Sequence, residues 1–153
     1  MSGRAFQFAL AASLDKARAD LRGRESALAA AERIRREEES RRGSCLAALE
    51  ATLSKIAASR ETLATPRAGR VDREDLYRIH RYLNGLEVIA ARERDQLRAA
   101  NKRLELAVER VRIRRREVET AFNQANALDK IRIAREAEHT MTVRRAQSHN
   151  EST

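Results

Sequence analysis

The sequence has few of the residues that build a thick protein interior or end a helix. Tryptophan is absent, aromatic residues make up 3% of the 153 residues, and there are one proline and five glycines. So few large apolar side chains argue against a compact globular core. Because helix breakers are equally scarce while alanine, leucine, glutamate and arginine are abundant, the composition favours long helices.

Residues suited to catalysis or metal binding are also sparse. Cys45 is the single cysteine, so no internal disulfide can form, and His80, His139 and His149 are widely separated. A reducing compartment, such as a bacterial cytoplasm, fits this cysteine usage, and Cys45 is expected to be a small core residue. No HExxH, CxxC, GxxxxGK[ST] or GxSxG motif occurs. We therefore expect a protein that is not an enzyme and binds neither a metal nor a cofactor.

Long hydrophobic runs are missing as well, whereas positive charge is in excess. No run approaches the roughly 18 apolar residues of a membrane-spanning helix. The opening apolar patch ends at Asp15, so we expect it to belong to an amphipathic helix rather than a secretory signal. The formal net charge is +9, which predicts attraction to acidic protein surfaces, nucleic acid or anionic lipid without choosing among them.

Apolar residues recur with heptad spacing in two long segments. In the first segment, Leu14, Leu21 and Leu28 share one heptad position. In the second, every seventh residue is apolar, through Leu76, Leu83, Ala90, Leu97, Leu104, Val111, Val118 and Ala125. A narrow stripe sustained over this many heptads is typical of a coiled coil.

Charged residues interrupt these stripes at a few positions. Arg24 in the first segment and Glu93 and Arg114 in the second occupy positions where the pattern calls for an apolar residue. The segment 35–44, RREEESRRGS, has no large apolar residue. The heptad register nevertheless continues through it, so we predict a polar patch within the first helix.

The segment ATPRAGRVDRED, residues 64–75, is the one clear break. Pro66 disfavours helical angles at Thr65, and Asp72 is a suitable N-cap for the next helix. We predict an all-α, antiparallel two-helix coiled-coil hairpin forming a single elongated domain over residues 1–153. Its parts are a first arm over about 5–63, a turn over about 64–72, a second arm over about 73–143 and a flexible tail over about 144–153.

A turn centred near residue 68 also predicts the register of the hairpin. Facing residues should then have numbers that sum to roughly 136. Arg42 would lie opposite Glu93, and we expect these oppositely charged residues to meet and help fix the register.

Two features leave more than one interpretation open. The basic run Val111–Glu119, VRIRRREVE, is interleaved with glutamates, so a solvated face with i,i+4 ion pairs, an acidic protein partner and nucleic acid all remain possible readings. Phe6 and Phe8 either cap the hairpin core or bind a partner, and Tyr77 and Tyr82 either anchor an interface or cover the hairpin surface.

Three stretches together resemble a known family. They are the opening F-x-F, the segment LYRIHRYLNGLEVIAARERDQL after the turn and the closing ALDKIRIAREAEHTMTVRRAQSHNE. From Phe6 to Glu151 the chain is similar to the FliJ family, the small coiled-coil component of the flagellar type III export apparatus. The YscO family of the injectisome looks alike at this level.

The resemblance implies a non-enzymatic stalk, monomeric by itself, whose paired ends insert into a hexameric export ATPase ring and stimulate it. It also implies contacts with the export gate protein FlhA and with export chaperones, and thereby a role in flagellum biogenesis, motility and chemotaxis. The expected location is cytoplasmic, peripheral at the cytoplasmic face of the inner membrane. The alternatives are an injectisome YscO-type stalk, or a basic coiled-coil adaptor or nucleic-acid-binding protein.

Site residues follow from the same resemblance. The residues implied to contact the ATPase ring are Phe6, Phe8, Leu10, Leu14, Leu128, Lys130, Ile131, Arg132 and Arg135. The residues implied to contact the export gate are Tyr82, Leu86, Ile89 and Glu93, of which Leu86 is also a stripe position of the hairpin.

Overall fold

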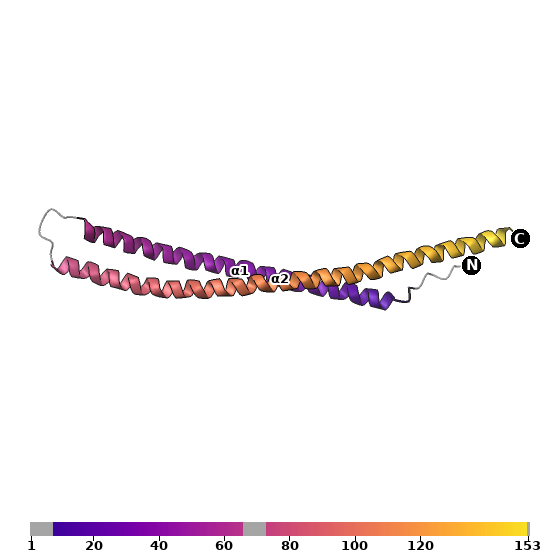
Figure 1. Ribbon diagram of the computed structural model, residues 1–153, viewed down its shortest axis with the longest axis horizontal. Helices are drawn as coiled ribbons and strands as arrows, with labels where there is room; N and C mark the ends of the chain where they lie inside the picture. The colour runs from indigo at the N-terminus through magenta and orange to yellow at the C-terminus, as the bar shows by residue number, and fades with distance from the viewer. Residues whose placement is uncertain (1–7, 66–72, 153) are drawn as a thin grey trace. The chain divides into compact units, whose positions relative to one another are not determined.

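The chain folds into two long helices. The computed structural model describes residues 8–65 and 73–152, and within them helix α1 spans Ala11–Ala64 and helix α2 spans Arg73–Glu151 (Figure 1). No strand occurs in these ranges. The two helices pack against each other, which confirms the predicted all-α helical hairpin.

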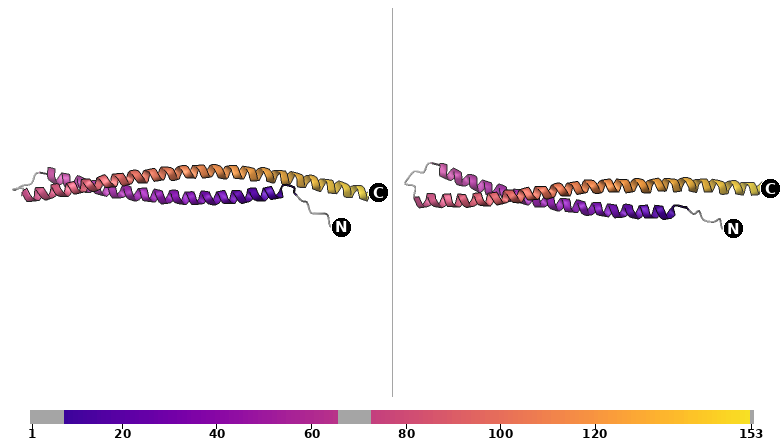
Figure 2. Two further views of the ribbon diagram at one scale, coloured as in Figure 1. Left: turned by 90° about the horizontal axis from the view of Figure 1, so that it is seen from below. Right: turned by 60° about the horizontal axis from the view of Figure 1, so that its bottom comes forward.

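Packing divides the hairpin into two units, each built from a segment of both helices. Unit 1 combines Met1–Ala31 with Val111–Thr153, and unit 2 is Glu32–Arg110. In each unit the two helical segments run in opposite directions (Figure 1). Within unit 1, the yellow end of α2 continues beyond the indigo start of α1 (Figure 2).

The helix ends follow local chemistry. Helix α2 begins at Arg73 with Glu74 and Asp75 in its first turn, where negative charge complements the helix dipole. Asp72, the expected N-cap, lies outside the described residues, as does most of the expected turn. At its other end α2 runs to Glu151, past the predicted end near Val143, so the segment expected to be a flexible tail is helical to that point. Neither proline nor glycine follows Gly85, so nothing in the sequence obliges α2 to stop earlier.

The predicted stripes form the interior of both units. In unit 2, the buried side chains of Leu49, Ile56, Leu86 and Ala90 make one cluster, with Leu97 packed against it. In unit 1 the buried stripe residues include Leu14, Ala31, Val111, Ala121 and Ala125. Since many of these residues are alanines, the interface between α1 and α2 is thin and the helices can approach closely.

The register of the hairpin differs from the one predicted. Arg42 donates a hydrogen bond from Nε to Asn101 Oδ1 at 2.6 Å, and Glu93 accepts one from the Thr52 hydroxyl. The prediction that Arg42 faces Glu93 was therefore wrong. The numbers of the two pairs sum to 143 and 145, about one heptad beyond the expected 136. Because the stripe repeats every seven residues, registers one heptad apart bury equivalent apolar sets, and the polar partners distinguish them.

The contact between Thr52 and Glu93 can be tested for its part in selecting this register. Thr52 is buried, and Glu93 holds a stripe position beside it. We expect Thr52→Val to lower the free energy of unfolding by about 1–2 kcal/mol, because it leaves a half-buried carboxylate without its donor. The double substitution Thr52→Val with Glu93→Leu should restore stability, since both polar groups are then gone. Urea unfolding followed by circular dichroism measures both, and additive losses in the double variant would refute the pairing.

Candidate functional site

The start of α1 is fixed against α2 in unit 1. Phe8 and Leu14 are buried, and the Arg135 guanidinium lies over the Phe8 ring, 5.9 Å from its centroid. Arg18 forms an ion pair with Asp129 at 3.0 Å. Phe8 therefore belongs to the packing between the helices, which supports the core-capping interpretation of this phenylalanine.

Helix α2 continues beyond this contact with every side chain exposed. The first residue of α1 is Ala11, whereas α2 reaches Glu151, and all residues from Ile133 to Ser152 are exposed. Ile133, Met141 and Val143 are large apolar residues among them. This segment of α2 thus presents apolar side chains that the described part of α1 does not cover.

The expected ring-contact residues are brought together in unit 1 but differ in accessibility. Lys130, Ile131 and Arg135 are exposed. Arg132 is half-buried and bonds Asp129 at 3.0 Å and Glu136 at 2.8 Å. Of the others, Phe8 and Leu14 are buried, Leu10 and Leu128 are half-buried, and Phe6 lies outside the described residues. A partner would therefore meet the α2 side chains first.

The four expected gate-contact residues separate into two pairs in unit 2. Tyr82 and Ile89 are exposed, Tyr82 to 54%. Leu86 lies in the buried cluster, and Glu93 is half-buried and bonded to Thr52. Tyr82 and Ile89 can thus contact a partner directly, while Leu86 and Glu93 hold the two helices together.

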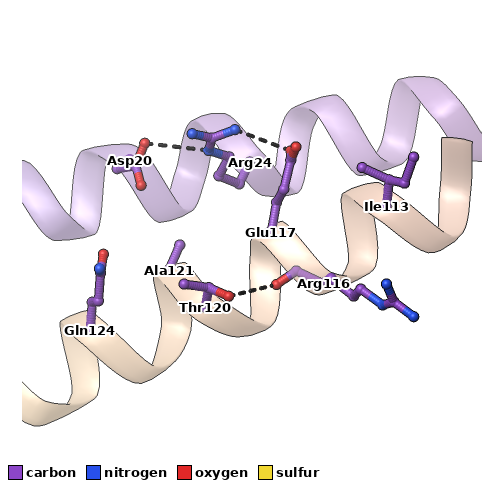
Figure 3. A pocket seen from close by; sticks show the side chains of 8 residues that line it. All are labelled: Asp20, Arg24, Ile113, Arg116, Glu117, Thr120, Ala121 and Gln124. Atoms are coloured by element: carbon purple, nitrogen blue, oxygen red, sulfur yellow. Dashed lines mark hydrogen bonds and ion pairs between the residues drawn. The ribbon is translucent and has the colours of Figure 1, made fainter.

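A three-residue ionic layer crosses unit 1. Glu117 accepts a hydrogen bond from Arg24 Nη1 at 3.1 Å (Figure 3). It accepts another from Arg114 Nη1 at 2.9 Å. Arg24 also lies 3.5 Å from Asp20. Sequence reasoning identified Arg24 and Arg114 only as exceptions to the stripes. It missed Glu117 because the pairing depends on the register.

Electrostatics around Glu117 keep it ionised. The hydrogen bond from Arg114 is the main factor that lowers the pKa of Glu117, and the charges of Arg114 and Arg24 act in the same direction. Removal of the carboxylate from water opposes these effects without cancelling them. Arg24 and Arg114, which both hold stripe positions, therefore share Glu117 as a counter-ion, and Arg24 has Asp20 as well.

Two grooves lie beside this layer in unit 1. One, of about 400 Å³, is lined by Asp20, Arg24, Ile113, Arg116, Glu117, Thr120, Ala121 and Gln124 (Figure 3). The other, of about 450 Å³, is lined by Ser13, Lys16, Ala17, Asp20, Gln124, Ala127 and Leu128. Both are open troughs along the helix pair rather than enclosed cavities, so they suit a macromolecular segment better than a small substrate.

Other kinds of site find little support in the described ranges. Residues 8–65 and 73–152 contain no group of three His, Cys, Asp or Glu side chains that could hold a metal ion. Over the same residues, neither helix has a stretch long and apolar enough to cross a membrane. Within the basic run, Arg114 donates to Glu117 at 2.9 Å, so part of the positive charge of the run is compensated within the hairpin.

Comparisons of the chain with protein-family models, curated proteins and solved structures give no match.

Proposed function

We propose that the chain is a stalk of the flagellar type III export apparatus, which binds a hexameric export ATPase through the end of unit 1 and stimulates it. The observation that carries the proposal is the continuation of α2 past the start of α1, with exposed basic and apolar side chains that include Lys130, Ile131 and Arg135. At this end of unit 1, the contact between Phe8 and Arg135 and the ion pair between Arg18 and Asp129 hold the start of α1 against α2.

A mechanism for stimulation follows from symmetry. Two packed helices, each about 10–12 Å across, cannot contact six identical subunits equally. Subunits that meet Lys130 and Arg135 gain interactions that the others lack. If these contacts favour one nucleotide state, the stalk shifts the populations around the ring and couples the subunits.

The exposed pair Tyr82 and Ile89 supports a second contact in unit 2. An exposed tyrosine, with an exposed isoleucine about two turns further along the same helix, supplies the aromatic and apolar area that protein interfaces favour. We assign this pair to the export gate. The chain would then link the ATPase to the gate and to export chaperones, at the cytoplasmic face of the inner membrane.

Charge reversal tests the ring contact. We expect Lys130→Glu with Arg135→Glu to reduce stimulation of the export ATPase several-fold, by roughly tenfold at low salt, because two attractive contacts become repulsive. The readout is ATP hydrolysis by the ATPase of the same organism, titrated with each variant. Circular dichroism melting must accompany it, since Arg135 also lies over Phe8.

The matched control reverses two exposed basic residues of unit 2. Arg98→Glu with Lys102→Glu changes the net charge equally at exposed positions of α2 away from the proposed ring contact. We expect it to stimulate nearly as well as the unchanged chain. Equal losses in the two double variants would show that only net charge matters and would contradict a contact at the end of unit 1.

The same geometry suits the injectisome counterpart, and titration against each type of ATPase distinguishes the two systems.

A further inference from the structure

A second line of residues runs along α2 in unit 1, separate from the stripe that packs on α1. It consists of residues spaced by seven: Ile113, Thr120, Ala127, Ala134 and Met141. All five are exposed, Ile113 to 45%. Charged residues occupy much of the remaining surface of α2, so a heptad line of small and apolar residues here has no role in the hairpin core.

The line borders the two grooves of unit 1. Ile113 and Thr120 line one groove, and Ala127 lines the other. Asp20 and Gln124 line both grooves, so the two adjoin along one flank of the helix pair. The small side chains on this flank let another helix approach closely, and the larger apolar side chains of that helix would fill the troughs.

The charges of this flank select the partner. Its two acids are engaged, Asp20 by Arg24 at 3.5 Å and Glu117 by Arg24 at 3.1 Å and Arg114 at 2.9 Å. Lys16 and Arg116 line the grooves as well, and in Figure 3 the Arg116 side chain points away from Glu117. The flank is therefore basic in balance. A second copy of this chain, with its net charge of +9, would bring like charge to it.

We infer that this flank of unit 1 is a docking site for an acidic amphipathic helix of a partner protein. From Ile113 to Ala127 the line measures about 21 Å at 1.5 Å per residue, which matches a partner helix of about four turns. Apolar residues of the partner lie over Ile113 and Ala127, and its flanking carboxylates face Lys16 and Arg116. The site excludes the exposed Lys130 and Arg135 and does not depend on the proposed ATPase contact.

A designed peptide tests the site with the full-length chain. The probe is a fluorescein-labelled helix of about 21 residues with leucine at heptad positions a and d and glutamate at the flanking positions. Fluorescence anisotropy should show saturable binding at low salt with Kd below about 100 µM. Ala127→Glu should weaken binding at least about tenfold, because the new side chain fills the trough and repels the peptide.

Matched controls separate docking at this flank from nonspecific binding of the peptide. Phe122 is an apolar residue of unit 1, 53% exposed, that lines neither groove, so Phe122→Ser should leave the affinity unchanged. The same peptide with lysine in place of glutamate should not bind. Circular dichroism should confirm that Ala127→Glu, at an exposed position, leaves the chain helical.

Several outcomes would overturn the inference. They are no saturable binding of the acidic peptide, equal affinity for Ala127→Glu and the unchanged chain, and equal affinity for the lysine peptide. A concentration-dependent dimer in sedimentation that Ala127→Glu abolishes would assign the flank to a second copy and also overturn it. Since no ATPase enters the assay, its result is independent of the proposed function.

Discussion

Replacing Leu86 with alanine is expected to lower the free energy of unfolding by about 2–3 kcal/mol, near the low end of the range for buried leucines. Leu86 is 6% exposed and lies in the unit 2 cluster with Leu49, Ile56 and Ala90. Its truncation removes apolar contacts from a cluster with few large side chains. The loss stays at the low end because water can reach a thin two-helix interface and fill part of the space.

Urea unfolding followed by circular dichroism measures this loss, and Leu106→Ala is the control. Leu106 is 67% exposed on the same helix and in the same unit, so its replacement should change stability by less than about 0.5 kcal/mol. If Leu86→Ala cost no more than Leu106→Ala, the described packing of unit 2 would be incorrect. The result also bears on the proposed gate contact. A binding defect in Leu86→Ala has to be separated from loss of structure, whereas Tyr82→Ala does not carry that complication.

The double substitution Arg24→Leu with Arg114→Leu is expected to raise the free energy of unfolding by about 2–4 kcal/mol. Both arginines hold stripe positions in unit 1 and bond Glu117, and Arg24 also pairs with Asp20. Glu117 keeps 30% of its side chain exposed and lines an open groove, so water can solvate its carboxylate once the arginines are gone. Leucines at the same positions would bury apolar surface in line with their neighbours. The single substitutions should gain less, since one arginine then remains at its stripe position.

The pH dependence of the free energy of unfolding gives an independent check on this ionic layer. The pKa of Glu117 is lowered in the folded chain from its ordinary 4.5, chiefly by the hydrogen bond from Arg114. A lowered folded-state pKa stabilises the protein above the unfolded value and loses that contribution as pH falls through the folded value. The unchanged chain should therefore lose more stability below pH 4.5 than the double leucine variant does. Parallel losses, or a double variant less stable at neutral pH, would contradict this account.

Much of the fold could be predicted because heptad spacing determines which residues face a partner helix. The line from Leu76 to Ala125 contains the buried Leu83, Ala90 and Val111, and Thr65 before Pro66 marks the end of α1. Helix propensity and spacing act locally, so one sequence is sufficient to read them.

The register could not be predicted, because it depends on contacts between residues far apart in the chain. A seven-residue repeat fits itself equally well when shifted by seven, and the turn centre expected near residue 68 gave a sum about one heptad too low. The choice rests on polar pairs such as Thr52 with Glu93 and Arg24 with Glu117. The division into two units was hidden for a similar reason, since the heptads run through both.

The candidate sites were partly visible in the sequence. The resemblance implied partner contacts for Tyr82, Ile89, Lys130 and Arg135, and the structure leaves all four exposed. The burial of Phe8 became clear only once α1 was paired with α2. The spacing of Ile113 and Ala127 was readable in principle, but its meaning depends on grooves formed by both helices.

The measurement that tests the central claim most directly is the ATP hydrolysis rate of the export ATPase from the same organism, titrated with this chain at several enzyme concentrations. A stalk that helps assemble and couple the ring should stimulate hydrolysis most where the ring is only partly assembled. No stimulation under conditions where the ATPase alone forms active hexamers at higher concentration would contradict the stalk assignment. That result would leave the helical hairpin and the basic flank of unit 1 in place, as the features of an adaptor.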